Sequence, residues 1–287
     1  MTTDPRLRVQ VAEGTMHVRQ SAISSFMDCR RKFFFEYVLG LEPDYPSGSR
    51  PWTTADTGTG FHEGMGAYYL GNDPMAAVDS WVSEQWPDGL PDGENLDLVR
   101  IMVEGHIEDL AQDGRDMGEL VVGVEVPVEA TVSDVLGVDV TIHGQVDRLI
   151  ETADGLCVID DWKSVASFTD IDNYIHQLGR YALLVRSSTG WRADRIRTTQ
   201  VKRVKRTKNG PFYQRQWAPL SEAAYATHAG NLRAVLEDMV TCMGTEAYYE
   251  HYTGECSWKC RVQSVCQAMM RGDDPEQIIE IHYREKK

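Results

Sequence analysis

The clearest pattern of apolar and polar residues lies in the middle of the chain, where two stretches rich in Val and Ile flank a short turn. The stretches run from Thr141 to Glu151 and from Leu156 to Lys163, and Thr152 to Gly155 supply the turn between them. This arrangement predicts a β-hairpin of two antiparallel strands. With the turn centred on that segment, Asp147 of the first strand lies directly opposite Asp161 of the second.

One face of this hairpin is charged. Successive side chains of a strand point to opposite faces, so Asp161 and Lys163 share a face, and Asp147 joins them from the facing strand. Two carboxylates with Cβ atoms about 5 Å apart destabilise a sheet, and a bound cation removes the repulsion. Carboxylate oxygens suit Mg²⁺ or Mn²⁺, which can activate water and stabilise a phosphoryl transition state. A neighbouring lysine can orient that water or neutralise charge on the phosphate, so the cluster predicts phosphodiester hydrolysis.

After Lys163 the spacing of apolar residues changes to three or four, as on one side of a helix. Gln177 and Tyr181 lie one turn apart on this predicted helix. A helix that returns over the charged face would aim both polar tips at a phosphate or a base. The apolar positions that carry the pattern are Ile171, Ile175, Leu178, Tyr181, Ala182 and Val185.

Further strands and helices are predicted on either side of the hairpin. Leu120 to Val132 alternates and predicts the first strand of the same sheet; Glu125 on it either supports the metal site or is a solvated strand residue. Asp194 to Arg206 predicts a strand with alternating basic residues, which returns through the turn Lys208-Asn209-Gly210 into Phe212 to Trp217. Helices are predicted over residues 21–39 with Ser21 as the cap, 58–71, 81–86, 96–111 and 221–243, and a loop over residues 42–59.

Together the elements predict a single α/β domain over residues 1–287, with a mixed central sheet flanked by helices. Residues 20–118 form a helical cover, residues 119–220 the sheet, and residues 221–287 a helix and a cysteine-rich segment. A chain of 287 residues, 42% of them hydrophobic, can bury a sizeable core. There is no run of about 18 apolar residues and no apolar core of a secretory signal, so we expect a cytoplasmic protein without a membrane span.

The net charge at first argues against a nucleic-acid partner, because phosphate contacts supply much of the affinity for DNA and the formal charge is -15. Between Arg192 and Lys208, however, eight basic residues stand against the single acid Asp194, a local charge of +7. Basic side chains interleaved with Tyr213 and Trp217 suit phosphate contact and base stacking, and a protected edge strand is the alternative. The residues expected to contact DNA are Lys202, Arg203, Lys205 and Arg206.

The chain contains six cysteines and no export signal, so these residues are expected to be reduced thiols or metal ligands. Cys256, Cys260 and Cys266 crowd near the C-terminus, and Cys29 lies in an aromatic-rich helix near the N-terminus. Taken alone, Cys29 is explained by a buried thiol. Four thiolates can also hold Zn²⁺ tetrahedrally.

The central motifs carry a resemblance to a known family. Gly144 and Asp147 on one strand, Asp161-Trp162-Lys163 on the next, and Gln177 with Tyr181 on the helix that follows resemble the PD-(D/E)xK nucleases, specifically the RecB-like exonucleases. This combination is far more specific than an isolated Asp-x-Lys. The resemblance implies a restriction-endonuclease-like fold in which Lys163 orients water or stabilises charge, Gln177 and Tyr181 position the substrate, and Mg²⁺ or Mn²⁺ is held by His62, Asp147, Asp161 and the carbonyl of Trp162.

The segment SAISSFMDCRRKFFFEYVLGL resembles the opening of RecB-like nucleases that carry an iron–sulfur cluster. In that group Cys29 is the first ligand, and the resemblance implies a structural four-iron, four-sulfur cluster on Cys29, Cys256, Cys260 and Cys266. The five-residue gap before Cys266 matches the group, whereas the three-residue gap before Cys260 departs from the more common gap of two. Zn²⁺ remains the alternative metal.

The resemblance extends from about Ser21 to Cys266 and implies a metal-dependent DNA exonuclease of the CRISPR-associated or phage type. Such an enzyme favours single-stranded DNA or free ends, acts in recombination, repair or DNA processing in a bacterium or infected host cell, and has recombination or CRISPR integration proteins as expected partners. Two alternatives remain: a non-cleaving DNA-binding or recombination-partner module on the same fold, and a zinc-stabilised RNA nuclease. The first would be marked by loss of Asp147, Asp161 or Lys163, and all three are present.

Overall fold

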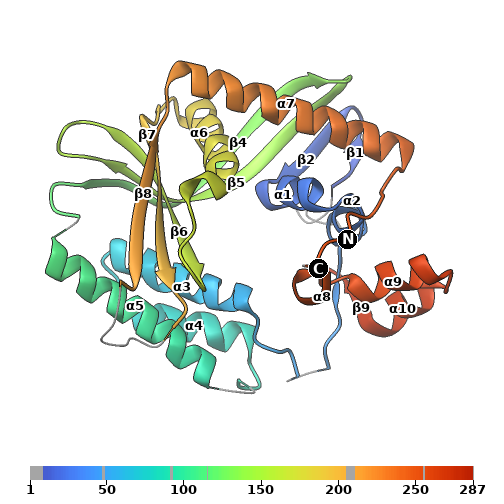
Figure 1. Cartoon of the computed structure of the whole chain (residues 1–287), viewed down its shortest axis with the longest axis horizontal. Coiled ribbons are helices and arrows are strands. Elements are labelled where there is room, and N and C mark those ends of the chain that lie inside the picture. Colours follow the sequence, from blue (N-terminus) through green and yellow to red (C-terminus); the bar gives the residue numbers. More distant parts are fainter. Residues whose placement is uncertain are drawn as a thin grey trace. The chain divides into compact units, whose positions relative to one another are not determined.

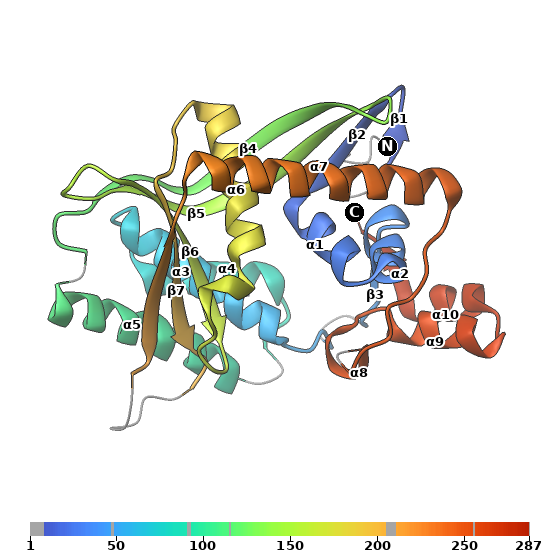
Figure 2. The same ribbon diagram turned by 45° about the horizontal axis from the view of Figure 1, so that its top comes forward.

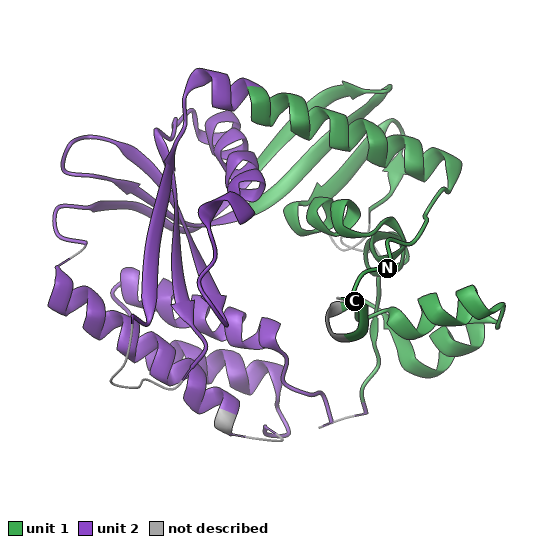
Figure 3. Cartoon of the chain, in the orientation of Figure 1, with its two compact units in different colours: residues 1–45, 129–144, 227–287 green, residues 46–128, 145–226 purple. Residues whose placement is uncertain are grey.

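The computed structural model describes residues 9–46, 49–90, 93–114, 116–204, 211–254 and 256–286, and Figures 1 and 2 show the ribbon in two views. The chain divides into two compact units (Figure 3). Unit 1 comprises Met1–Tyr45, Glu129–Gly144 and Thr227–Lys287, and unit 2 comprises Pro46–Val128 and Gln145–Ala226. Two strands and one helix contribute residues to both units: β4 (Leu120–Val135), β5 (Val138–Glu151) and α7 (Glu222–Thr245).

Unit 2 is built on a mixed sheet. β5 pairs with β4 and runs antiparallel to β6 (Cys157–Val165), which runs parallel to β7 (Arg195–Lys202). β7 in turn runs antiparallel to β8 (Tyr213–Pro219). The predicted mixed sheet that contains the first strand, the hairpin and the basic strand is therefore confirmed.

The register of the β5–β6 hairpin is the predicted one. Arg148 pairs with Asp160 and Leu149 with Ile159. The turn closes where the Thr152 N–H donates to the Leu156 carbonyl at 2.9 Å. Because one face of a strand alternates with the other, this register puts the odd-numbered acidic residues of both strands on one face and their even-numbered neighbours on the opposite face.

Helices cover both faces of the unit 2 sheet (Figures 1 and 2). α3 (Thr54–Tyr69), α4 (Pro74–Gln85) and α5 (Glu94–Asp113) lie on the face of Trp162, whose ring stacks on Tyr69 of α3 with centroids 5.5 Å apart. The helix α6 (Ile175–Thr189) follows the short η2 (Ile171–Asn173) and covers the opposite face.

The predicted loop over residues 42–59 is wrong at its end, because α3 begins at Thr54. Thr53 and Asp56 form a capping box: the Thr53 N–H donates to Asp56 Oδ2 at 2.7 Å, and the Asp56 N–H donates to Thr53 Oγ1 at 3.3 Å. This reciprocal pair satisfies backbone donors that would otherwise lack partners at the helix start. Inside the helix, Gly64 lets α5 approach so closely that a Cβ would lie 2.7 Å from Val103.

Unit 1 joins the two ends of the chain. β1 (Val11–Ala12) and β2 (Thr15–Arg19) form a hairpin, and β2 runs parallel to the first part of β5. β3 (Leu41–Pro43) pairs antiparallel with β9 (Tyr283–Glu285). Three helices precede β9: α8 (Cys256–Lys259), α9 (Gln263–Arg271) and α10 (Pro275–His282).

The predicted continuous helix over residues 21–39 is wrong in two respects. It begins at Gln20 with Arg19 as its N-cap, so Ser21 is not the cap. It is also interrupted: α1 (Gln20–Asp28) ends at Cys29, which is extended with φ −162° and ψ 117°, and α2 (Arg30–Phe33) and the π-helix η1 (Phe34–Val38) follow. The break leaves Cys29 in extended backbone between α1 and α2. Within the described ranges, no helix has the length and apolarity needed to cross a membrane.

A cluster of ion pairs lies buried on the α3 face of the unit 2 sheet. Asp160 accepts from Arg148 at 2.7 Å, from Arg197 at 3.1 Å and from the Thr199 hydroxyl at 2.9 Å. Arg148 and Asp160 are both fully buried. Burial raises the pKa of Asp160, but the guanidinium groups of Arg197 and Arg148 outweigh it and hold that pKa well below its usual range. The carboxylate therefore stays ionised, and each member needs its partners.

Removal of one partner is expected to destabilise the fold strongly. Arg148→Met should lower the free energy of unfolding by about 3–5 kcal/mol, because it leaves the Asp160 charge buried and underpaired. The matched control is Arg100→Met, which removes an ion pair with Asp79 at 2.6 Å between exposed side chains and should cost about 0–1 kcal/mol. Urea unfolding followed by circular dichroism measures both variants. Equal losses would show that the buried cluster has no special role.

Candidate active site

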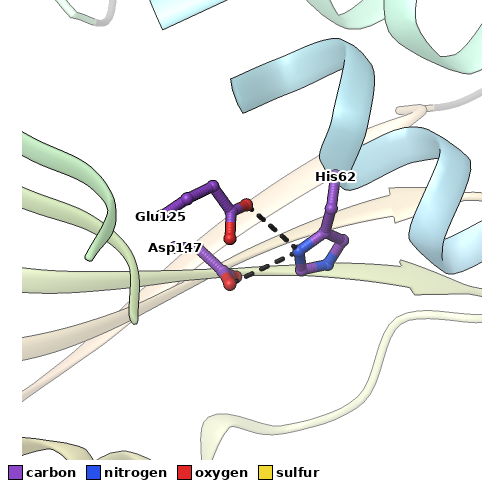
Figure 4. Close-up of side chains that lie close together, drawn as sticks. All are labelled: His62, Glu125 and Asp147. Atoms are coloured by element: carbon purple, nitrogen blue, oxygen red, sulfur yellow. Dashed lines mark ion pairs between the residues drawn. The ribbon is translucent and has the colours of Figure 1, made fainter. Parts of the chain in front are cut away.

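Three potential metal ligands converge between α3 and the sheet of unit 2 (Figure 4). His62 Nδ1 lies 3.3 Å from Asp147 Oδ1 and 3.9 Å from Glu125 Oε1. One ligand atom from each of the three residues lies within 4.8 Å of the others. His62 comes from α3, Glu125 from β4 and Asp147 from β5, so the sheet and its covering helix build the group together.

The local backbone explains why Glu125 points into this group. Its φ of +50° lies in the left-handed region that non-glycine residues rarely adopt, and this interrupts the regular course of β4. Gln145 Nε2 donates to Glu125 Oε2 at 2.5 Å and fixes one carboxylate oxygen. On α3, Gly66 leaves room for the Glu125 side chain, since a Cβ there would lie 3.4 Å from its Cγ.

The backbone of Trp162 orients both His62 and Asp147. His62 Nε2 lies 3.0 Å from the Trp162 carbonyl, so this nitrogen carries the proton and Nδ1 faces the carboxylates. The Trp162 N–H donates to Asp147 Oδ2 at 2.6 Å. Burial lowers the pKa of His62, but the charge and hydrogen bond of Asp147, helped by Glu125, outweigh it and raise that pKa to about 9.

Burial has the opposite effect on a carboxyl group: it raises the pKa of Glu125 to about 7, and the charge of Asp147 adds to this rise. Glu125 Oε1 is buried and has no hydrogen-bond partner among the described residues. A buried carboxylate oxygen without a donor, aimed at a histidine nitrogen and a second carboxylate, is the donor set that a divalent cation takes. The three residues therefore fit a metal ion.

Asp161 and Lys163 form an ion pair beside this group, with 2.6 Å between Oδ2 and Nζ. Burial raises the pKa of Asp161 to about 6; Lys163 opposes the shift and Asp147 adds to it. Burial lowers the pKa of Lys163, but Asp161 and Asp147 outweigh it and raise that pKa, so the ammonium stays charged. The mutual influence of these three residues places Asp147, Asp161 and Lys163 in one electrostatic cluster.

The predicted positioning residues lie on α6. Gln177 Nε2 donates to the Tyr181 hydroxyl at 3.4 Å. Burial and the charge of Asp161 raise the pKa of Tyr181 to about 12, so the phenol is protonated and can donate. The return of this helix over the charged face is thus observed, and the assigned roles of Gln177 and Tyr181 stay predictions.

Two of the four predicted metal ligands lie in the convergent group. His62 and Asp147 belong to the convergent group, whereas Asp161 pairs with Lys163, and the Trp162 carbonyl pairs with His62. Whether Asp161 and Trp162 bind the metal stays a prediction. Glu125 is the third member of the convergent group. Its position on an alternating strand did not show whether its side chain would point toward the other two residues or toward solvent.

The basic segment is described only in part. Lys202 Nζ lies 4.4 Å from the Phe168 ring centroid, and Arg203 Nη1 donates to the Ser164 carbonyl at 3.0 Å. Lys205 and Arg206, and the predicted turn Lys208-Asn209-Gly210, lie outside the described residues. Tyr213 is buried and packs on His106, which excludes it as a stacking surface, whereas Trp217 is exposed.

The four predicted cluster cysteines all belong to unit 1 and are free thiols. Cys29, Cys256 and Cys260 line a cavity of about 420 Å³. The His251 N–H donates to Cys29 Sγ at 3.3 Å, and Arg31 Nη1 lies 4.0 Å from Cys266 Sγ. The break of the helix at Cys29 gives that thiol access to the C-terminal segment.

A model of the PD-(D/E)XK nuclease superfamily matches residues 17–267. This chain belongs to that superfamily. The matched range contains Asp147 and Asp161-Trp162-Lys163, and their place in the family signature stays a prediction. Membership supports a hydrolase that cuts nucleic acid, and His62, Glu125 and Asp147 are residues that could hold its divalent metal.

Two solved structures are similar to this PD-(D/E)XK chain. A candidate exonuclease from Eubacterium rectale shares 15% sequence identity with a TM-score of 0.51, over 85% of this chain and 86% of that chain. SSO0001 shares 14% identity with a TM-score of 0.40, over 90% of this chain and 87% of that chain. No curated protein matches the chain. The likeness to the Eubacterium rectale protein shows the fold alone.

The place of Glu125 gives a test of the metal site in this superfamily member. Glu125→Gln should weaken Mn²⁺ binding at least about tenfold, since loss even of an outer partner typically costs 10–100-fold. Mn²⁺ is suitable because it prefers oxygen ligands to thiolates. Titration calorimetry measures the affinity, and Glu129→Gln on the same strand, with its side chain 68% exposed, is the control. If Glu125→Gln bound Mn²⁺ with wild-type affinity, Glu125 would not be a metal ligand, and its role would be the hydrogen bond with Gln145.

Proposed function

We propose that this chain is a metal-dependent DNA exonuclease that favours single-stranded DNA. The observation that carries the proposal is the electrostatic cluster of Asp147, Asp161 and Lys163 beside the His62–Glu125–Asp147 group. A chain that only bound DNA would not need a charged lysine paired with one buried carboxylate, Asp161, and influenced by the charge of a second, Asp147. The pathway in which it acts, recombination, repair or CRISPR-associated processing, and its protein partners are part of the proposal through the family resemblance.

The residues divide the chemistry among them. His62, Glu125 and Asp147, joined by Asp161 and the Trp162 carbonyl, would hold Mg²⁺ or Mn²⁺, which supplies an activated water and stabilises charge on the phosphate. The Lys163 ammonium, which Asp161 anchors at 2.6 Å, orients the water and neutralises the extra negative charge of the transition state.

The residues of α6 handle the substrate. The Tyr181 hydroxyl, whose pKa burial raises to about 12, remains a donor to a phosphate oxygen. Gln177 contacts that hydroxyl and holds it in place. Lys202 and Arg203, at the end of β7, are the described basic residues that we assign to phosphate contact.

The four cysteines are assigned to a structural four-iron, four-sulfur cluster. A single zinc ion with Zn–S bonds of about 2.3 Å holds its sulfurs about 3.8 Å apart. In the described chain, no three cysteine sulfurs lie within 4.8 Å of one another. Cys29, Cys256 and Cys260, spread around a cavity of about 420 Å³, suit a polynuclear cluster better than one ion.

The decisive assay is digestion of end-labelled single-stranded DNA with Mn²⁺. Asp161→Ala and Lys163→Ala should each lower the rate at least about 100-fold, as loss of a group that stabilises transition-state charge does. Asp97→Ala, an exposed acidic residue of α5, is the control. RNA and duplex DNA substrates run in parallel. Equal rates in all variants would reject the assigned centre, and tight binding without cutting by the wild type would favour the non-cleaving module.

The cluster has its own test. Protein purified without oxygen should be brown and contain iron, and Cys260→Ser should lose the colour and melt at a lower temperature, because the clip that joins distant segments is gone. Cys157→Ser, outside the four, should change neither property. Stoichiometric zinc without iron, or unchanged melting of Cys260→Ser, would contradict the assignment.

A further inference from the structure

The loop between β6 and α6 is fixed in place by a buried glutamine. Gln200 of β7 is fully buried. Its Oε1 accepts from the Thr169 N–H at 2.9 Å, and its Nε2 donates to the Thr169 carbonyl at 2.7 Å. The side-chain amide thus forms the two hydrogen bonds that a neighbouring strand would otherwise form with the backbone of Thr169. Because a buried amide without hydrogen-bond partners is costly, this pairing holds the loop in one conformation.

The fixed loop presents two partly exposed aromatic rings, Phe168 and Tyr174. The Thr169 hydroxyl donates to the Tyr174 hydroxyl at 3.0 Å and ties the second ring to the same loop. Each ring lies beside a different ammonium group. Lys202 Nζ is 4.4 Å from the Phe168 centroid, and Lys163 Nζ is 5.6 Å from the Tyr174 centroid.

Each ring, with the ammonium group that lies over it, offers one contact for a base and one for a phosphate of a single strand. A base that stacks on an aromatic side chain is stabilised without regard to sequence, and the neighbouring cation neutralises the phosphate. In a duplex the faces of the bases are already stacked on one another, so the rings have no free partner. Since Lys163 is the proposed catalytic lysine, the Tyr174 ring lies next to the position of the reacting phosphate.

We infer that Phe168 and Tyr174 form a stacking platform that seats the bases next to the scissile phosphate of single-stranded DNA. The inference rests on the proposed function and deepens it, because it names the residues that would select single strands. Gln200 acts through the loop and is a positioning residue. Lys202 contributes charge and not base stacking.

The test compares two labelled strands of equal length and charge, oligo-dT and a strand of abasic spacers, by fluorescence anisotropy without added divalent metal. Wild type should bind oligo-dT about tenfold more tightly, which corresponds to about 1.4 kcal/mol of stacking. Phe168→Leu and Tyr174→Leu, which keep apolar bulk and lose the ring face, should reduce this ratio toward one. Tyr174→Phe, which keeps the ring, should preserve it. Lys202→Gln should weaken both strands alike.

The outcomes separate this inference from the proposed function. A ratio of one in wild type, or wild-type ratios in both leucine variants, would overturn the platform even if the enzyme cuts DNA. A wild-type protein that distinguishes the strands but never cuts would overturn the exonuclease and leave the platform standing. Melting temperatures confirm that each variant is folded, and a leucine variant that melts early is replaced by Phe168→Met or Tyr174→Met.

Discussion

The buried contact between Arg148 and Asp160 is the constraint on which the site depends. These residues face each other across β5 and β6 and are the immediate chain neighbours of Asp147 and Asp161. A slip of one residue in the pairing would turn every side chain to the opposite face, placing Asp160 toward α6 and burying Lys163 among apolar groups. A buried ion pair is a weak source of net stability, but a slipped register would leave its charges buried without their partners, which is strongly destabilising. Here the selected register gathers the acidic cluster.

A stack of three side chains carries this constraint to the covering helix. The Arg148 guanidinium lies 4.0 Å from the centroid of the Tyr69 ring, and the Trp162 ring stacks on the same ring. The backbone of Trp162 then holds Asp147 through its N–H and His62 through its carbonyl. A buried tryptophan in the middle of the Asp-x-Lys motif therefore does more than fill space: its main chain fixes two potential ligands from different elements.

The sequence predicted the parts of this site that depend on local spacing. The hairpin, its register and the helix with Gln177 and Tyr181 follow from alternation and from a change of period, which local residues determine. The role of Glu125 does not, because its positive φ and its approach to Gly66 arise only when β4 meets α3. The break at Cys29 could not be predicted either, because the apolar residues on both sides of it have helical spacing. The start of α3 could have been predicted from the sequence, since Thr53 and Asp56 have the spacing of a capping box with an acidic residue.

The order in which residues contribute to unit 1 has a consequence for synthesis. Its β3 strand, at Leu41–Pro43, pairs with β9, at Tyr283–Glu285. On the ribosome, both segments of unit 2, Pro46–Val128 and Gln145–Ala226, emerge and can begin to pack while β9 is still untranslated, since domains generally fold as units during synthesis. β3 must wait until β9 has been made. A nascent chain released early would thus expose the apolar surfaces of Phe35 and Leu41, which Val262 and Val265 cover in the finished fold, and would become a target for chaperones and proteases.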